Sequence, residues 1–468
     1  YFTFSVPNHQ YTPAYKNKLW DGQIRLYNLH TQKIYAGLID YVLKFAVDRK
    51  YSITNNYKYP SFSMSEKDVR KYIEDTIKPT SSGVSIKPHE HQISAITHAL
   101  NKERCLLLSP TGSGKSLMIY TLIRYYESII PEDKKILIIV PTTGLVSQMY
   151  NDFLDYSFKN KWDTENNCHV VFAGQDKDTP KRVVISTWQS LYKMPEKYFN
   201  QFNVIFGDEV HLFKAKSLVS IMSKLKDCPY RIGTTGTLDD SQTHKLVIEG
   251  LFGRIFNVTT TKHLMEKNLL SNLSIECLNL QYNINDIQEV KRVPYHDEIK
   301  WIVGNKKRND FIVNLCCKIE GNILLLFNYV DSHGIPLYEN IKKTCVDKKV
   351  FLIHGGTEIE QRENIRRIVN EEENAILVAS YGTCSTGINI KNIHNVIFSS
   401  PSKSVVRVLQ SLGRGLRKSK TKDSVKLYDI SDNLQHKKYI NHTMRHFADR
   451  IKIYTKEKFS FNIIKIRI

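Results

Sequence analysis

The sequence Ser109-Pro110-Thr111-Gly112-Ser113-Gly114-Lys115-Ser116 directly follows an apolar run, Arg104–Leu108, and precedes a helical pattern. A strand, a glycine-rich loop and a helix in this order are the context of a phosphate-binding loop. The glycines allow backbone N–H groups to face a phosphate, and the helix N-terminus adds a favourable dipole. We expect residues 110–116 to surround the phosphates of ATP, with Lys115 at the β- and γ-phosphates and Ser116 at Mg²⁺. A solvated lysine in a chance glycine-rich turn is the alternative, and Ser109 departs from the glycine of the strict pattern.

Short β-branched runs alternate with helical patterns from about residue 85 to residue 430, which is typical of parallel-sheet α/β architecture. Near-continuous apolar runs such as Ile136–Val140 and Ile323–Phe327 suit strands that are buried on both faces. The runs expected to form strands are Arg104–Leu108, Lys135–Val140, Val183–Ser186, Val204–Phe206 and Tyr230–Gly233, then Asn322–Phe327, Lys349–Ile353, Ala375–Ala379, Asn395–Phe398 and Val425–Tyr428. Two such sets predict an α/β fold with two tandem parallel-sheet lobes.

The two lobes are expected at residues 85–258 and 259–432, between a small N-terminal accessory domain at 1–84 and a basic C-terminal extension at 433–468. Residues 259–307 have mixed polar sequence with weak strands such as Leu273–Leu280, and we expect them to form the crossover between the lobes. In the extension, apolar residues spaced by three and four predict an amphipathic helix. These are Ile440, Met444, Phe447, Ile451 and Tyr454.

The 468 residues include 67 Lys and Arg against 47 Asp and Glu, a net charge of +20. Such an excess favours a nucleic-acid partner, although an ordinary basic surface is the alternative. No apolar run approaches the roughly 20 residues of a membrane span, so we expect no membrane partner. The eight cysteines include no CxxC pair, which argues against a disulfide framework and a structural zinc site and favours a reducing cytoplasm. We expect the adjacent Cys316 and Cys317 to be buried and inert.

Asp208, Glu209 and His211 follow the expected strand Val204–Phe206, at the carboxyl end where open α/β sheets bind ligands. Phosphoryl transfer needs mainly positioning and charge neutralisation. We therefore expect Asp208 to hold Mg²⁺ and Glu209 to orient or deprotonate the attacking water. A surface Asp-Glu pair is usually only solvated, but a phosphate loop in the same lobe favours the catalytic interpretation.

A basic run in the second lobe has seven Lys and Arg and no acidic residue between Lys403 and Lys422. Within it, Arg414 and Arg417 follow Gln410 and would lie on one face of a helix. Guanidinium groups there could reach a γ-phosphate as arginine fingers, and we expect all three residues to act in catalysis. Contact with nucleic-acid phosphates is the alternative, and different residues of the run could serve each role.

Together these motifs resemble those of helicase superfamily 2, in the family's order, from about residue 87 to residue 430. The resemblance implies two RecA-like lobes, with ATP in the cleft between them, and an ATP hydrolase with a DExH box. Pro88-His-Glu-His-Gln92 resembles the adenine-reading element, so Gln92 is the implied adenine contact. Gly233-Thr-Thr-Gly-Thr237 resembles the motif that couples hydrolysis to movement. The residues implied for coupling are His211, Thr235 and Thr237, and those implied at the nucleotide in the second lobe are Gly387 and Asn389, where many relatives have Asp at position 389.

Two segments, Ile139-Val-Pro-Thr-Thr143 and Ser186-Thr-Trp-Gln189, resemble first-lobe strands of this superfamily whose ends touch the nucleic-acid backbone. Leu326-Phe-Asn328 and His354-Gly-Gly356 resemble second-lobe elements, and Ser385-Thr-Gly-Ile-Asn389 resembles the motif that senses both the strand and the nucleotide. The DNA contacts implied by the resemblance are Thr142, Thr187, Trp188, Asn328, His354, Gly355, Ser380 and Thr386.

The N-terminal stretch Asn17-Lys-Leu-Trp20-Asp-Gly-Gln-Ile-Arg25-Leu26 resembles the UvsW-type DNA helicases of tailed phages. That resemblance implies action on branched DNA, namely fork regression, Holliday-junction branch migration and R-loop removal, in phage replication, recombination and repair in the host cytoplasm. Lys16, Lys18, Trp20 and Arg25 interleave basic and aromatic side chains that could contact phosphates and stack on a base. A place in the core of a small domain is the alternative for Trp20.

The sequence therefore predicts a DNA helicase or translocase that uses ATP and Mg²⁺, holds no structural metal and remodels branched duplexes. An RNA-directed or R-loop-directed ATPase with the same two lobes is one alternative, because the 2′-OH contacts that would decide cannot be read from a sequence. A non-catalytic nucleic-acid-binding scaffold is another, which intact Lys115, Asp208 and Glu209 disfavour.

Overall fold

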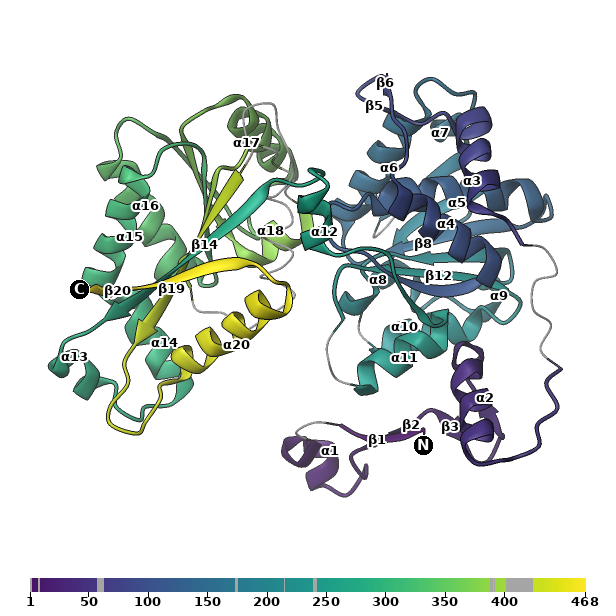
Figure 1. Ribbon diagram of the computed structural model, residues 1–468, viewed down its shortest axis with the longest axis horizontal. Coiled ribbons are helices and arrows are strands. Elements are labelled where there is room, and N and C mark those ends of the chain that lie inside the picture. Colours follow the sequence, from purple (N-terminus) through teal and green to yellow (C-terminus); the bar gives the residue numbers. More distant parts are fainter. Residues whose placement is uncertain are drawn as a thin grey trace. The chain divides into compact units, whose positions relative to one another are not determined.

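The structure is a computed structural model of the chain and describes residues 2–6, 9–56, 63–172, 176–213, 215–238, 242–387, 390, 392–400 and 424–468. It divides into two compact units, Tyr1–Thr259 and Thr260–Ile468 (Figure 1). Each unit is built on a seven-stranded sheet whose neighbouring strands are parallel. The two-lobed α/β fold is thus confirmed, whereas the finer division into four parts stays a prediction.

The sheet of the first unit has the strand order β13-β7-β12-β11-β8-β10-β9. The bounds of these strands are Ile255–Asn257, Arg104–Leu108, Tyr230–Thr235, Phe202–Gly207, Lys135–Val140, Val183–Thr187 and Cys168–Val171. Their central residues, such as Ile138 and Ile205, are fully buried because helices cover both faces of the sheet. All five strands expected in this half are confirmed, and β9 and β13 are additions at the two edges.

Helices α4, α5 and α6 contribute to the hydrophobic core on one face of this sheet, and α8 to α11 contribute to the core on the other. In chain order the helices are α4 (Glu90–Lys102), α5 (Lys115–Ile129), α6 (Thr143–Ser157), α7 (Thr164–Asn167), α8 (Trp188–Leu191), α9 (Glu196–Phe199), η4 (Val210–Leu212), α10 (Ala215–Lys224) and α11 (Gln242–Phe252). Each of α4, α5 and α6 runs for at least 13 residues, long enough to span the sheet.

The N-terminal segment packs on the rest of the first unit. Leu26 and Leu38 are buried in the core that α11 shares, and Tyr41 Oη donates to Glu249 Oε2 at 2.9 Å. A Cβ on Gly37 would lie 2.1 Å from the carbonyl oxygen of Glu249, so only glycine permits this close approach. The elements of this segment are β1 (Thr3–Ser5), η1 (His9–Tyr11), α1 (Pro13–Lys16), β2 (Gln23–Arg25), β3 (Tyr27–Asn28), β4 (Lys33–Ile34), η2 (Ala36–Leu38), α2 (Ile39–Asp48), α3 (Glu66–Tyr72), η3 (Ile73–Ile77), β5 (Thr80–Ser81) and β6 (Val84–Ser85).

The sheet of the second unit has the strand order β16-β17-β15-β18-β19-β14-β20. The bounds are Lys349–Ile353, Ala375–Ser380, Ile323–Phe327, Asn395–Phe398, Ser424–Asn433, Asn272–Gln281 and Ser460–Arg467. The helices are α12 (Thr261–Glu266), α13 (Ile284–Glu289), α14 (Tyr295–Gly304), α15 (Lys306–Lys318), η5 (Val330–Gly334), α16 (Ile335–Thr344), α17 (Ile359–Glu371), α18 (Tyr381–Gly387) and α20 (His442–Lys456). All five strands expected in this half are confirmed.

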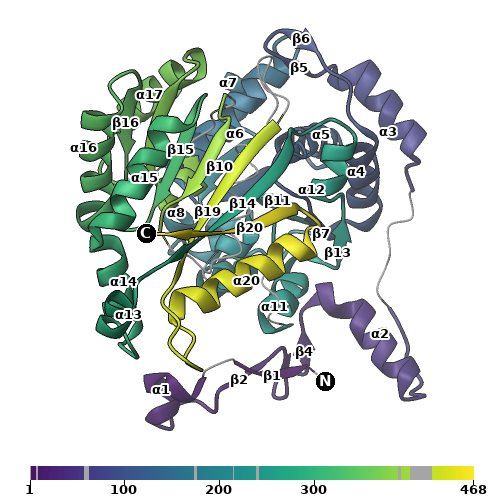
Figure 2. The same cartoon turned by 60° about the vertical axis from the view of Figure 1, so that its left-hand side comes forward.

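Two strands of this sheet depart from the sequence interpretation. β14 was expected only as a weak strand in a crossover, yet it pairs with β19 along its whole length and with β20 on its other side. The expected amphipathic helix is confirmed as α20, which lies against β19 (Figure 2). β20 follows α20 in the chain. The C-terminal extension thus continues from a helix into an edge strand of the second sheet.

Fully buried charges tie the second unit together. Arg308 of α15 pairs with Asp432 of β19 at 2.7 Å and also donates to the carbonyl oxygen of Ser399. Glu298 of α14 accepts hydrogen bonds from the backbone N–H groups of His442 and Thr443, at the N-terminus of α20. A carboxylate at that position also complements the helix dipole, so α14 fixes where α20 starts.

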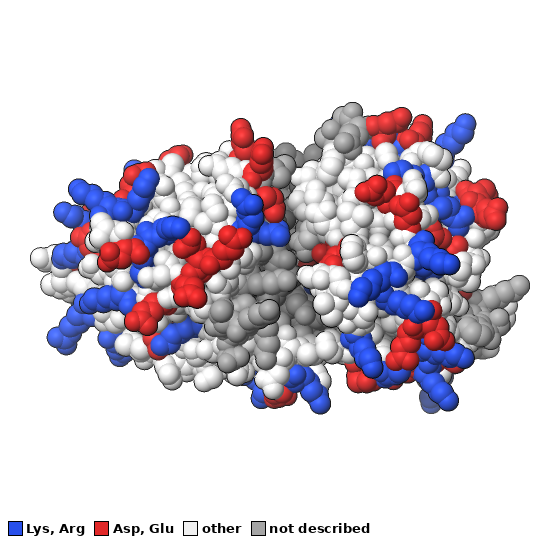
Figure 3. Space-filling model, turned by 90° about the horizontal axis from the view of Figure 1, so that it is seen from above, with Lys and Arg blue, Asp and Glu red and all other residues white. Residues whose placement is uncertain are grey.

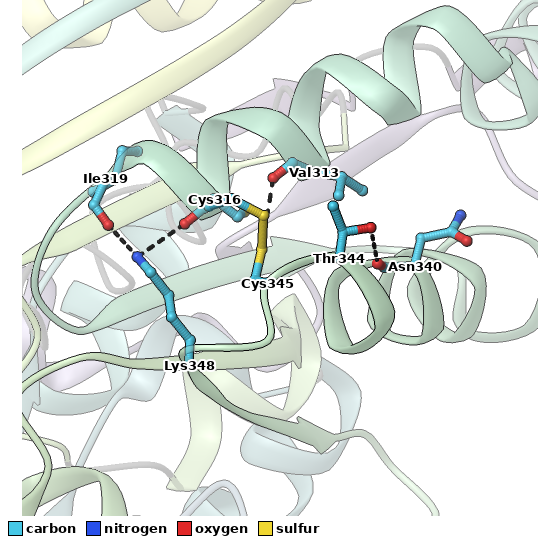
Figure 4. Close-up of a disulfide and its surroundings, with 8 residues drawn as sticks. Val313, Cys316, Ile319, Asn340, Thr344, Cys345 and Lys348 are labelled. Atoms are coloured by element: carbon cyan, nitrogen blue, oxygen red, sulfur yellow. Dashed lines mark hydrogen bonds between the residues drawn. A yellow bond between two sulfur atoms is a disulfide. The ribbon is translucent and has the colours of Figure 1, made fainter.

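Cys317 of α15 and Cys345, at the end of α16, form a disulfide with their Cα atoms 5.1 Å apart (Figure 4). The expectation that Cys317 is buried and inert is therefore wrong, whereas Cys316 is buried and free. The two half-cystines are 28 residues apart, and only the packing of α15 beside α16 brings them together. Lys348 also links this region to the end of α15, because its Nζ donates to the carbonyl oxygens of Cys316 and Ile319.

Candidate functional site

The carboxyl edge of the first sheet gathers the residues expected to bind and hydrolyse ATP. The neighbouring strands β7, β12 and β11 end there, with Leu108 paired to Thr235 and Gly233 paired to Gly207. The phosphate loop follows β7, and Asp208 follows β11. The next two strands, β8 and β10, lead into Thr142 and Trp188, which are expected to contact DNA. One edge of the first sheet therefore holds members of both sets of residues, on separate strands.

The phosphate loop has the backbone that its glycines permit. Gly112 and Gly114 have φ angles of +86° and +85°, in the left-handed region that favours glycine. The first turn of α4 supports the loop, since Gln92 Nε2 and His91 Nε2 both donate to the carbonyl oxygen of Ser113, at 2.9 and 3.0 Å. A Cβ on Gly114 would lie 2.1 Å from Gln92 Nε2. Gln92 is thus placed beside the loop, and its contact with adenine stays a prediction.

Lys115 joins the phosphate loop to the DExH box. Its Nζ lies 3.1 Å from Glu209 Oε1 and donates to the carbonyl oxygen of Ser109 at 3.2 Å. The two side chains are 11% and 12% exposed, so this pair reaches the surface of the unit. A phosphate group that approached the loop would compete with Glu209 for the Lys115 ammonium.

Asp208 is held by hydrogen bonds from its neighbours. Its Oδ1 accepts from Thr234 Oγ1 at 2.5 Å and from the backbone N–H of Glu209 at 3.0 Å. Burial, together with the nearby Glu209, raises the pKa of Asp208 to about 6. Burial would also raise the pKa of Glu209, but Lys115 and His211 outweigh it and lower that pKa. Glu209 is therefore the firmly ionised member of the pair.

The DExH box touches the predicted coupling motif directly. His211 Nδ1 lies 2.5 Å from Thr235 Oγ1 and 3.4 Å from Glu209 Oε2. Thr235 Oγ1 in turn donates to the carbonyl oxygen of Thr237 at 2.7 Å, and the backbone N–H of Gly236 donates to Glu209 Oε2 at 3.3 Å. A movement of Glu209 would thus change the hydrogen bonds of residues 235–237, which supports the coupling hypothesis.

Sequence reasoning missed Tyr156, which touches the phosphate loop. Its hydroxyl lies 2.8 Å from Ser116 Oγ. Tyr156 lies near the end of α6, 40 residues after Ser116, outside every motif quoted above. No local pattern marks it, because α6 must pack against α5 before the two hydroxyls meet.

The DNA contacts expected in the first unit lie where β8 and β10 end. Thr142 caps the N-terminus of α6, with its Oγ1 accepting from the backbone N–H of Leu145. Thr187 is buried, and its hydroxyl bonds to that of Ser190 at 3.0 Å. Trp188 is half-buried against the core that contains α8 to α11. Both threonine hydroxyls therefore have roles in the fold, and their contact with DNA stays a prediction.

The corresponding residues of the second unit also share one sheet edge. Asn328, His354 and Ser380 lie at the carboxyl ends of β15, β16 and β17, which are neighbours in the sheet. Arg362 holds the turn after β16, since its Nη2 donates to the carbonyl oxygens of His354 and Gly355. The structure therefore gathers these predicted contacts, and their binding to DNA stays a prediction.

The N-terminal residues expected to bind DNA are spread over helix α1, the turn that follows it and strand β2. Lys16 and Lys18 are exposed, whereas Arg25 is bonded to Asp21. Trp20 is half-buried, and its Nε1 donates to the carbonyl oxygen of Gln23 at 2.8 Å. Its ring is thus fixed by the local turn and is absent from the hydrophobic clusters of the described residues.

Several expected residues lie outside what the structure describes. They are Gln410, Arg414, Arg417 and Asn389, together with the side chain of Thr386. Gly387 is the last residue of α18. The basic run from Lys403 to Lys422 also lies outside, and with it seven of the Lys and Arg that make the chain basic.

The described surface mixes both signs of charge. On the face in Figure 3, Lys and Arg are interspersed with Asp and Glu over both units, without a continuous basic area. Among the described residues no three His, Cys, Asp or Glu side chains gather as a metal cluster. None of their helices is long and apolar enough to cross a bilayer.

Three domain families match the chain. They are "Type III restriction enzyme, res subunit" over residues 85–240, "Helicase conserved C-terminal domain" over residues 306–419, and "DNA helicase UvsW, N-terminal" over residues 1–56. The chain is also 33% identical to the ATP-dependent DNA helicase uvsW of Enterobacteria phage T4, over 98% of this chain and 93% of that protein. This chain belongs to the UvsW-type DNA helicases of superfamily 2. As a member of that family it is an ATP-dependent DNA helicase.

Other comparisons agree with this family. The crystal structure of T4 UvsW is 31% identical, covers 100% of this chain and 94% of its own, and superposes with a TM-score of 0.50. The DNA 3'-5' translocase XPB2 of Sulfurisphaera tokodaii is 24% identical over 77% of this chain and 88% of its own length. The two general helicase families match residues 85–240 and 306–419, and the family named for UvsW matches residues 1–56. The likeness to UvsW therefore includes the N-terminal segment.

Proposed function

We propose that this UvsW-type helicase is a Mg²⁺- and ATP-driven motor that remodels branched DNA, by fork regression, Holliday-junction branch migration and duplex unwinding. Its setting would be phage replication, recombination and repair in the host cytoplasm. The observation that carries the ATPase part is the direct contact between Lys115 and Glu209, which brings the phosphate loop and the DExH box into one site.

In this proposal each residue of the site has one task. Lys115 binds the β- and γ-phosphates, and Glu209, ionised beside it, orients or deprotonates the attacking water. His211 and Thr235 carry the change at Glu209 to residues 235–237, as their contact supports. Arg414 and Arg417 would supply charge to the γ-phosphate from the second lobe.

The proposed Mg²⁺ ligands, Ser116 and Asp208, fit such an ion chemically. Mg²⁺ prefers oxygen ligands and is usually bound by one or two side chains together with waters and phosphate oxygens. Within the described residues both hydrogen bonds of the Asp208 carboxylate use Oδ1, which leaves Oδ2 for a cation. When bound, Mg²⁺ would neutralise charge on the phosphate oxygens.

Branch migration of DNA needs less energy per step from such a motor than plain unwinding does. Branch migration exchanges old base pairs for new ones and is nearly balanced in energy, whereas plain unwinding opposes about 1.4 kcal/mol per base-pair step. The relative in phage T4 is named only as a DNA helicase, so the preference for branches belongs to this proposal.

The test compares ATP hydrolysis and product formation on single-stranded DNA, forked DNA, a four-way junction and an RNA–DNA hybrid. We expect forks and junctions to stimulate hydrolysis most and to be converted into regressed or migrated products. Stimulation by the RNA–DNA hybrid alone would overturn the branched-DNA proposal in favour of the R-loop alternative. DNA binding without hydrolysis on any substrate would favour the scaffold.

A further inference from the structure

The contact between Ser116 and Tyr156 lies at the residue proposed to bind Mg²⁺. Ser116 Oγ and Tyr156 Oη are 2.8 Å apart, and either can donate. A serine hydroxyl has one proton and two lone pairs. When one lone pair binds a cation, the O–H bond is polarised and its proton needs an acceptor. Tyr156 Oη is such an acceptor.

Three carbonyl oxygens of the phosphate loop accept hydrogen bonds from groups other than the Ser116 hydroxyl. The carbonyl oxygen of Ser109 accepts from Lys115, that of Pro110 from Ser113, and that of Ser113 from Gln92 and His91. Within the described residues, the hydrogen-bond partner of the Ser116 hydroxyl comes from outside the loop, on a different helix.

Tyr156 is held firmly enough to act as that partner. Its ring packs against Tyr120, with centroids 5.5 Å apart, and Tyr120 lies one turn after Ser116 on the same face of α5. Asn160 Nδ2 donates to Tyr120 Oη at 3.0 Å and to the carbonyl oxygen of Ile77 at 2.8 Å. The position of the phenol is thus set by the packing of α5, α6 and η3.

We propose that Tyr156 is a positioning residue for the ATP site. Its Oη accepts a hydrogen bond from the Ser116 hydroxyl, which orients a lone pair of Ser116 Oγ toward Mg²⁺. The inference rests on the proposed role of Ser116 as a Mg²⁺ ligand. Outer partners of metal ligands typically change metal affinity about 10–100-fold when they are removed. The same range is expected here.

The test is Tyr156→Phe in the full chain, which removes the hydroxyl and keeps the ring that packs on Tyr120. Equilibrium binding of a fluorescent ADP analogue is measured over a MgCl₂ series and in EDTA. We expect unchanged affinity in EDTA and about a 10-fold or greater rise in the Mg²⁺ concentration that gives half of the tightening. Equal weakening with and without Mg²⁺ would indicate a structural role and overturn the inference.

Tyr150→Phe is the matched control. Tyr150 lies on the same helix, and within the described residues its hydroxyl makes no hydrogen bond. Its Mg²⁺ dependence should equal that of the unmodified chain. An effect as large as that of Tyr156→Phe would overturn the assignment to the Ser116 contact.

Ser116→Ala separates this inference from the function on which it rests. We expect it to raise the Mg²⁺ requirement, and Tyr156→Phe to add nothing in the Ser116→Ala background, because both act through one hydroxyl. If Ser116→Ala has the effect and Tyr156→Phe has none, the inference fails and the Mg²⁺ ligand stands. If Ser116→Ala leaves the Mg²⁺ dependence unchanged, the ligand assignment itself fails.

Discussion

The two units share a parallel-sheet frame but use their charged residues in opposite ways. In the first, Lys115 and Glu209 lie at a sheet edge, partly exposed, and pair with each other. In the second, Arg308 and Asp432 have no exposed side-chain surface and join a helix to a strand. A charge pair near the surface can be parted by a ligand, whereas a buried one is costly to disturb. Exposure therefore separates a pair available for chemistry from a pair that serves the fold.

The largest effect should come from Glu209→Gln. Loss of a group that orients or deprotonates water typically costs about 10²–10⁴ in rate, so DNA-stimulated ATP hydrolysis should fall by that range while ATP still binds. Steady-state hydrolysis and nucleotide binding are the measurements. Glu276→Gln is the control, because Glu276 pairs with Lys426 far along the chain in the other sheet. Normal turnover in Glu209→Gln would place the base elsewhere.

Arg308→Met should mainly lower the stability of the second unit. It leaves Asp432 buried without its cation, which typically costs about 3–5 kcal/mol. Urea unfolding should show the transition of the second unit shifted and that of the first unit unchanged. A loss below about 1 kcal/mol, the range of an exposed pair, would contradict the contrast between the two pairs.

The bond between Cys317 and Cys345 should stabilise the second unit in oxidising buffer, and reduction to two thiols should remove that stabilisation. Removing a disulfide typically costs about 2–4 kcal/mol, so Cys317→Ser should lower the melting temperature in oxidising buffer and have little effect in dithiothreitol. Cys316→Ala, at the adjacent free thiol, should keep the full response to reductant. A Cys317→Ser chain that still responds to dithiothreitol would show that another pair is responsible.

The smallest effect is expected from Glu298→Gln. The amide nitrogen would face the backbone N–H of His442 in place of an accepting oxygen, and an unmatched buried group costs about 1–3 kcal/mol. Hydrogen exchange should show faster opening at the start of α20 while ATP hydrolysis is unchanged. Unaltered protection there would mean that Glu298 does not hold the start of α20.

Much of the fold could be read from the sequence because its inner strands are buried on both faces. Runs such as Ile136–Val140 and Ile323–Phe327 are apolar throughout and stand out from the helices between them. β20 has no such signal, because it is an edge strand with exposed Ile463 and Ile464 among basic residues. β14 alternates buried and exposed residues at its start, so its sequence resembles a half-covered strand although it lies inside the sheet.

The candidate site was predictable where its chemistry is local. Lys115 and Ser116 are marked by the glycines beside them, and Asp208 and Glu209 by the strand before them. The contact between Lys115 and Glu209 follows from two strands ending at one edge, which the strand order decides. Tyr156 has no mark at all, since its role depends on how α6 crosses α5.

By itself the sequence determined the strands, the glycine loop and the type of chemistry, because backbone conformation and hydrophobic periodicity are local properties. Only the tertiary structure decided which groups share a hydrogen bond. Ser116 with Tyr156, Arg308 with Asp432 and Cys317 with Cys345 each join separate elements. Such pairs are set by helix packing and strand order, which no stretch of sequence holds alone.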